Sequence, residues 1–247
     1  ILVIEFYGQS PEEVRHKCQT MVRALTEASL GYAHPVIEGP DIQRVWALRK
    51  AGLGVLFGKP GDVKPVTLVE DTAVAVADLP AFIAEFAEIM AAYRADCVYY
   101  AHASVGELHL RPELNLKNRD DIARAEGIAR DVAVLVRKYR GALSGEHGDG
   151  RLRSPYLREA LGEEVVALLK QVKGAFDPDG LFNPGNIVDP SPMTANWRYH
   201  EGYGHPDIPA EFRYAASGGL QRAVERCNGA GVCRRPAAAG GTMCPSY

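Results

Sequence analysis

Two histidines and a glutamate–histidine pair are the residues whose types and spacing suit chemistry at a metal ion. His102 and His109 are seven residues apart and flank a tight turn expected at residues 104–106. Both imidazoles can therefore reach one edge of a hairpin. Glu146 and His147 lie in the run SGEHGDG, whose glycines let the backbone approach a ligand closely.

Two imidazoles and one carboxylate form a ligand set for zinc or another divalent metal, with an open position left for a substrate. Such a metal would polarise a hydroxyl or carboxylate oxygen and lower the pKa of a bound alcohol. His147, beside Glu146, is placed to take that proton, because imidazole acts as a base near neutral pH. A lone histidine in a strand is more often structural, so the hypothesis requires all four side chains to meet.

The elements that must position these residues alternate between helices and strands. Together they favour an α+β domain with a mainly antiparallel sheet covered by helices on one face. A boundary near residues 189–192 divides a domain at 1–190 from an appendage at 191–247. Strands are expected at 1–7 (buried), 66–76, 97–103 and 107–111; helices at 10–28, 40 to the glycines from 52 onward, 79–93, 120–139 and 162–176; and a glycine-rich loop at 144–150.

Composition excludes several classes of protein. The net charge of -3 argues against a nucleic-acid-binding surface, and no run of about 18 apolar residues suggests a membrane span. The sequence starts within an apolar strand-like run and lacks an initial Met, which suggests a piece of a longer protein. Five cysteines, three of them near the C-terminus, fit metal or iron–sulfur ligation better than secreted disulfides. We expect a cytoplasmic protein, held at the inner face of a membrane at most through partners.

Three runs in order resemble one family: HASVGELHLRP, SGEHGDGRLR and AFDPDGLFNPGNIV. They are similar to the C-terminal, ferredoxin-like domain of the FAD-linked oxidases of the vanillyl-alcohol-oxidase type. That group includes D-lactate, glycolate and D-2-hydroxyglutarate dehydrogenases, and the resemblance covers roughly residues 1–190. It implies that His102, His109 and Glu146 hold a divalent metal, with zinc as the first choice, and that His147 is the base.

The resemblance also implies how substrate and flavin are bound. Arg49, in the W-x-L-R pattern that begins at Trp46, matches the arginine that binds the substrate carboxylate, and Lys64 matches a second cation about fifteen residues on. A guanidinium suits bidentate binding of a carboxylate, although a solvated charge on a helix face is an equal alternative from the residues alone. Asn183 in the run FNPG matches a residue near the flavin, although asparagine is also a turn former.

The sequence departs from the family pattern at two positions and in its extent. Glu107 stands where relatives often have Asn, and Arg111 stands two residues after the second histidine where many also have Asn. An extra cation there would suit a second acidic group on the substrate. The FAD-binding domain of the family precedes this one, and neither it nor a GxGxxG fingerprint is found here. The chain by itself is therefore not expected to hold FAD.

The C-terminal cysteines resemble the start of an iron–sulfur region fused to this type of dehydrogenase. Cys227, Cys233 and Cys244, the last followed by Pro245, would supply three of the four thiolates of a [4Fe–4S] cluster. The alternative is three free thiols in a tail. In the full protein we expect a cluster that accepts electrons from reduced flavin.

The reaction expected from these observations is the oxidation of a small 2-hydroxy acid to the 2-oxo acid by FAD, with electrons passing through iron–sulfur centres to an acceptor. One alternative is a metal-dependent hydrolase that uses the same histidines and glutamate to activate water. Another is a non-catalytic electron-transfer or assembly module centred on the cysteines. The hydroxy acid, the metal and the oligomeric state, a homo-oligomer included, stay open.

Overall fold

The computed structural model describes residues 1–204, 208–209, 211–227 and 231. It divides into two compact units, Ile1–Gly52 and Leu53–Tyr247. The boundary expected near residue 190 stays a prediction, but the segment after it contributes to the second unit: Met193 is buried in the hydrophobic core and Trp197 packs against it.

The first unit is built on helices. Helix α1 (Pro11–Glu27) begins as expected, with the Ser10 hydroxyl accepting a hydrogen bond from the backbone N–H of Glu13. Helix α2 (Asp41–Phe57) begins in the first unit and ends in the second, directly before Gly58. The break expected from residue 52 onward is therefore wrong at Gly52 and Gly54 and confirmed at Gly58. Gly52 and Gly54 keep negative φ angles, and glycine in a helix costs only about 1 kcal/mol relative to alanine, so the helix continues through both.

The buried strand expected at residues 1–7 is also wrong. These residues form no strand, and Ile1 and Leu2 are fully or largely exposed. An apolar run becomes a strand only where a neighbouring strand satisfies its backbone groups. Among the described residues, every strand lies in the second unit and pairs there.

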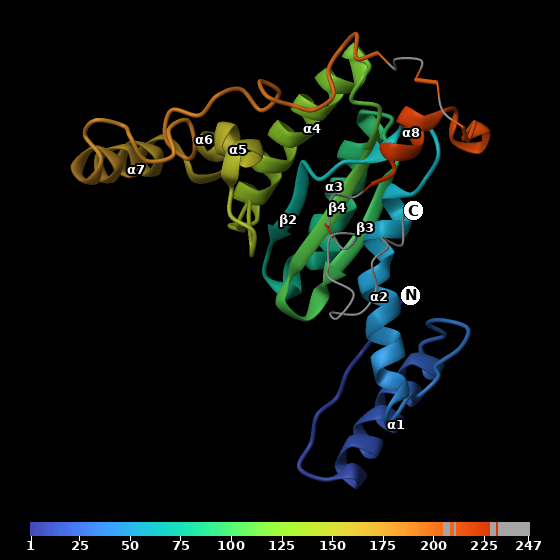
Figure 1. Ribbon diagram of the computed structural model, residues 1–247. Coiled ribbons are helices and arrows are strands. Elements are labelled where there is room, and N and C mark those ends of the chain that lie inside the picture. The colour runs from blue at the N-terminus through green and yellow to red at the C-terminus, as the bar shows by residue number, and fades with distance from the viewer. Residues whose placement is uncertain (205–207, 210, 228–230, 232–247) are drawn as a thin grey trace. The chain divides into compact units, whose positions relative to one another are not determined.

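The second unit contains a four-stranded antiparallel sheet centred on β4 (Glu107–Leu114). Strand β3 (Cys97–His102) pairs with one edge of β4, while β1 (Lys64–Pro65) and β2 (Val69–Ala73) pair with successive parts of the other (Figure 1). The strand expected at 66–76 is confirmed in part as the shorter β2, and β1 lies before the expected range. A β-bulge interrupts β2 between Glu70 and Thr72. The antiparallel α+β fold is confirmed.

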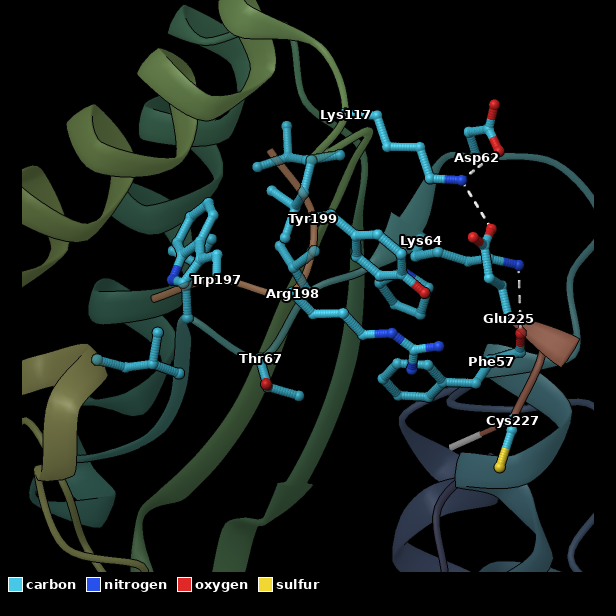
Figure 2. Close-up of a pocket in the computed structure, with 16 residues that line it drawn as sticks. Phe57, Asp62, Lys64, Thr67, Lys117, Trp197, Arg198, Tyr199, Glu225 and Cys227 are labelled. Atoms are coloured by element: carbon cyan, nitrogen blue, oxygen red, sulfur yellow. Dashed lines mark hydrogen bonds and ion pairs between the residues drawn. The ribbon is translucent and has the colours of Figure 1, made fainter. Parts of the chain in front are cut away.

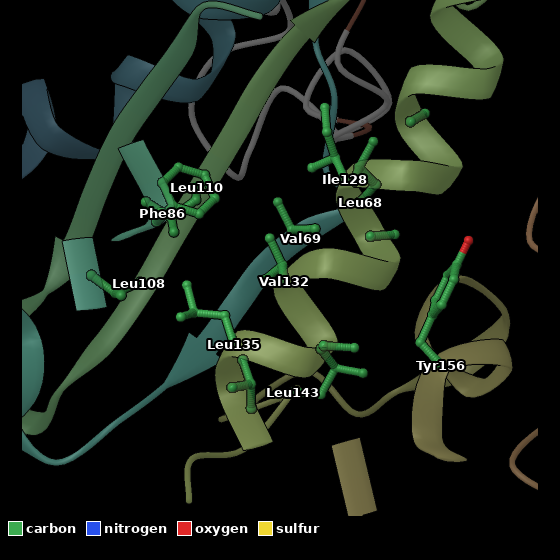
Figure 3. Close-up of a cluster of buried hydrophobic side chains, with 14 of the residues drawn as sticks. Leu68, Val69, Phe86, Leu108, Leu110, Ile128, Val132, Leu135, Leu143 and Tyr156 are labelled. Atoms are coloured by element: carbon green, nitrogen blue, oxygen red, sulfur yellow. The ribbon is translucent and has the colours of Figure 1, made fainter. Parts of the chain in front are cut away.

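Helices α3 (Leu79–Ala92) and α4 (Arg119–Lys138) form the hydrophobic core with the sheet. Figure 3 shows side chains of α4, such as Val132 and Leu135, beside Phe86 of α3 and Leu108 and Leu110 of β4. Asn118 caps α4 by accepting hydrogen bonds from the N–H groups of the first turn. This layer fixes one face of β4 and leaves its other face for the site.

Shorter elements complete the second unit. Helix α7 was expected and is confirmed, whereas α5, α6 and α8 were not expected. These helices and the short 3-10 helices, labelled η, have the following bounds: η1 (Val76–Asp78), η2 (Ala103–Val105), α5 (Gly150–Arg153), η3 (Ser154–Tyr156), α6 (Leu157–Leu161), α7 (Glu163–Phe176), η4 (Ala215–Ser217) and α8 (Leu220–Val224).

Candidate metal and substrate site

Strand β4 presents polar side chains on one face and apolar ones on the other. Side chains alternate along a strand, so Leu108 and Leu110 enter the core while Glu107, His109 and Arg111 lie on the opposite face. All five are buried. Burial of three ionisable residues on one strand face requires partners, and these come from β2, β3 and the glycine-rich loop.

A glycine makes the turn between β3 and β4 tight enough to bring the two histidines together. Gly106 has φ +77°, and a Cβ atom there would lie 1.8 Å from the carbonyl oxygen of Val74. The turn leaves the ring centroids of His102 and His109 5.2 Å apart. The hairpin geometry expected from the sequence is confirmed.

The glycine-rich loop adds Glu146 to this pair. The Glu146 Oε1 atom lies 3.5 Å from His109 Nε2, and Glu107 Oε1 lies 3.7 Å from the same nitrogen. One donor atom each from His102, Glu107, His109 and Glu146 lies within 4.8 Å of the other three. The structure therefore brings the three expected ligands together and adds Glu107. Their role as metal ligands stays a prediction.

Asp71 holds the loop that carries Glu146 and His147. It sits in the bulge of β2 with φ +82° and is fully buried. Its carboxylate accepts hydrogen bonds from the Ser144 hydroxyl and from the backbone N–H groups of Glu146 (2.8 Å) and His147 (2.9 Å). Burial by itself would raise the pKa of Asp71, but these hydrogen bonds lower it to about 2.

His147 lies over the site with half of its side chain exposed to solvent. Its Nε2 atom is 3.2 Å from Glu146 Oε1, and its ring stacks on that of His109 with centroids 5.6 Å apart. Its Nδ1 atom is 3.3 Å from Glu70 Oε1. A carboxylate beside one ring nitrogen can orient the imidazole, as in a histidine that serves as a general base.

Glu70 also lies behind the second histidine of the site. Its Oε2 atom is 3.7 Å from His109 Nδ1 and accepts a 2.9 Å hydrogen bond from Arg111. A carboxylate behind a histidine is the arrangement that orients imidazole ligands of metals. Arg111 is buried and forms an ion pair with Glu70. It therefore helps to position the Glu70 carboxylate beside His109.

The electrostatics of the cluster suit a cation. Burial, a hydrogen bond to Asp71 and the negative charge of Glu146 raise the pKa of Glu107 to about 7. Burial lowers the pKa of His109, which favours the neutral imidazole that metals bind. Glu107 Oε1, which faces His109 Nε2, is a buried atom without a hydrogen-bond partner among the described residues. This donor set therefore fits a divalent metal.

The residues predicted to bind the substrate and the flavin are not among the side chains of this cluster. Lys64 pairs with Leu114, five residues along β4 from His109, or about 17 Å of strand. Arg49 belongs to the first unit, where its guanidinium lies 5.6 Å from the Trp46 ring. Asn183 is an exposed turn residue whose side chain accepts a hydrogen bond from Asn186. Their functional roles stay predictions.

Lys64 lines a separate cavity of about 350 Å³ (Figure 2). Its ammonium group donates to the backbone carbonyls of Phe57 and Lys59, and burial lowers its pKa. Trp197 and Tyr199 of the C-terminal segment line the same cavity. The exposed Cys227 also lies at this cavity, whereas Cys233 and Cys244 are outside the described residues.

Sequence reasoning missed the residues that support the site. Glu70, Asp71 and Arg153 were not expected to contribute. Arg153 is buried and donates hydrogen bonds to the backbone carbonyls of Glu70 (3.1 Å) and Gly148 (2.6 Å), which ties the loop to β2. The acidic pair in the middle of an apolar strand was the available signal, because charged residues interrupt such a strand only where they have partners.

An antiparallel sheet packed against helices on one face thus carries histidines and carboxylates on its other face. Residues 1–187 match the family model of the FAD linked oxidases, C-terminal domain. The chain belongs to this family. No helix among the described residues is long and apolar enough to cross a membrane.

The chain is also similar to curated dehydrogenases and to a subunit of an oxidase. The chain is 39% identical over 193 residues to a D-2-hydroxyglutarate dehydrogenase of Pseudomonas putida, covering 77% of this chain and 19% of the relative. It is 32% identical over 259 residues to that of Escherichia coli, covering 99% of this chain and 24% of the relative. Glycolate oxidase subunit GlcD of Escherichia coli is 26% identical over 215 residues, 87% of this chain and 42% of that subunit. The chain thus spans about a fifth to a quarter of the dehydrogenases it matches.

Proposed function

We propose that this chain is the substrate-side part of an FAD-dependent dehydrogenase that oxidises a 2-hydroxy acid, with D-2-hydroxyglutarate as the first candidate. The observation that carries the proposal is the gathering of His102, His109 and Glu146 around one point, with His147 3.2 Å from Glu146. The family supports the use of FAD, and the dehydrogenase relatives support the choice of substrate.

In this proposal, His102, His109 and Glu146 hold a divalent metal, which would polarise the substrate hydroxyl. His147 takes the hydroxyl proton. Glu70 orients its imidazole through Nδ1 and stabilises the imidazolium that forms. A bound flavin would supply the acceptor for the hydride of the substrate α-carbon. Asp71 keeps His147 in place by holding its backbone N–H at 2.9 Å.

Arg49 and Lys64 are proposed to bind the substrate carboxylate, as the resemblance implies. The route of electrons to an iron–sulfur cluster held by Cys227, Cys233 and Cys244 is likewise proposed from that resemblance. Asn183 is proposed to approach the flavin from its exposed turn.

The test is anaerobic reduction of flavin in the full-length protein by a panel of D- and L-2-hydroxy acids. We expect bleaching of the flavin absorbance by one enantiomer series. We expect His147→Ala to slow it at least about 100-fold, the contribution typical of a general base, while flavin stays bound. His16→Ala is the matched control, because His16 is an exposed residue of α1.

The outcomes separate this proposal from its two rivals. A hydrolase would show no flavin reduction by any hydroxy acid. An electron-transfer or assembly module would lose activity with the cysteines but keep it in His147→Ala. Normal turnover of His147→Ala would discard the assignment of the base.

A further inference from the structure

Glu107 has a buried carboxylate oxygen that the proposed chemistry does not yet use. Its side chain is 9% exposed, and it lies on the site face of β4, two residues before His109. Its Oε1 atom is buried and has no hydrogen-bond partner among the described residues. Such an oxygen is unfavourable unless a cation or a donor meets it, because it has lost its hydration.

The position of that oxygen fits a coordination sphere. Two donors bound to one ion at about 2.1 Å lie about 3.0 to 4.2 Å apart, depending on whether they are adjacent or opposite. Glu107 Oε1 is 3.7 Å from His109 Nε2, and Glu146 Oε1 is 3.5 Å from the same atom. Both separations fall inside this range, and one donor atom each from His102, Glu107, His109 and Glu146 lies within 4.8 Å of the other three, which supports a shared ion.

We propose that Glu107 is a fourth protein ligand, so that the site binds its metal through two imidazoles and two carboxylates. This inference rests on the proposed function. Four ligands would fill a tetrahedral zinc ion and leave no position for a substrate. A six-coordinate ion such as Co²⁺ or Mn²⁺ keeps two positions, which the hydroxyl and carboxylate oxygens of a 2-hydroxy acid can occupy together. Two carboxylates also balance the charge of a divalent cation.

A structural role for Glu107 is the rival explanation. In that case Glu107 is a carboxylic acid that shares a proton with the neighbouring Asp71 and never contacts a metal. Glutamine has the same shape and can donate the same hydrogen bond, so Glu107→Gln would preserve this role. The two explanations therefore differ in what Glu107→Gln does to metal binding.

The experiment is a titration of the whole protein, stripped of metal, with Co²⁺ and no substrate. Calorimetry gives the affinity, and the visible absorption of Co²⁺ gives the coordination number, because six-coordinate Co²⁺ absorbs far more weakly than four-coordinate Co²⁺. We expect the weak six-coordinate spectrum in the unmodified protein. We expect Glu107→Gln to weaken Co²⁺ binding at least about 100-fold. Loss of a residue that only supports a ligand costs up to about 100-fold, so loss of a ligand should cost at least as much. Glu113→Gln is the control, because Glu113 lies on the same strand but pairs with Lys59.

Each result decides between the explanations. Equal Co²⁺ affinity in Glu107→Gln and the unmodified protein would overturn the inference and leave the proposed function intact. An intense four-coordinate spectrum that Glu107→Gln leaves unchanged would overturn it as well, because the Glu107 carboxylate would then contribute no ligand to the ion. Failure of the unmodified protein to bind Co²⁺ at all would instead remove the metal from the proposed function, and this inference with it.

Discussion

Replacement of Asp71 by Asn removes the charge that anchors the loop of Glu146 and His147. Asn is nearly the same size and tolerates a positive φ angle about as well as Asp, so the backbone at φ +82° is not strained further. The variant keeps one acceptor oxygen where three donors converge. A buried N–H or O–H left without its acceptor costs about 1–3 kcal/mol.

The lowered pKa of Asp71, which has the same hydrogen bonds as its cause, gives a second magnitude. The difference between its ordinary value of 3.8 and about 2 corresponds to about 2.5 kcal/mol of stability near neutral pH. Because the pKa is lowered in the folded protein, this contribution is fully present above about pH 4 and is lost as the pH falls through about 2. We therefore expect Asp71→Asn to lower the free energy of unfolding by about 2 to 4 kcal/mol at pH 7, and by progressively less below pH 4.

Urea denaturation followed by tryptophan fluorescence measures this change. The chain has two tryptophans, so a Trp46→Phe background leaves Trp197 to report on the second unit alone. Asp179→Asn is the matched control, because Asp179 is exposed. A loss below about 0.5 kcal/mol at pH 7, within the range of ordinary surface substitutions, would refute the reasoning that Asp71 anchors the loop.

Two further predictions concern the hairpin and a partly buried thiol. Gly106→Ala should destabilise the second unit by at least about 3 kcal/mol in the same assay, because the new Cβ would clash with the Val74 carbonyl and alanine is unfavourable at a left-handed φ angle. Gly174→Ala is the control and should be neutral or stabilising, because Gly174 lies in open space on helix α7. Equal effects of the two substitutions would contradict the geometry of the turn. Partial burial raises the pKa of the Cys97 thiol to about 12, so at pH 8 Cys97 should resist alkylation in the folded protein and react after unfolding. Mass spectrometry can follow the reaction, and rapid labelling of the folded protein would contradict the raised pKa.

Local patterns in the sequence determined much of the fold. Ser10, followed by a proline and two acids, predicts the start of α1, and the alternation in ELHLRPEL separates the core face of β4 from its site face. Both signals depend on neighbours along the chain. The strand expected at residues 1–7 was wrong because a strand also needs a partner, which an apolar run does not specify.

The residues of the site also fall into those that the sequence identified and those that only the tertiary structure identified. Residue types and a seven-residue spacing were enough to select His102, His109, Glu146 and His147, because a short hairpin and a glycine-rich loop are local structures. Only the tertiary structure assigned Glu70 and Asp71 to the site. Their position depends on the antiparallel register of β2 against β4 and on a bulge that turns two successive acids toward the same cluster. Such pairing joins residues about 40 to 75 positions apart, and no local pattern encodes it.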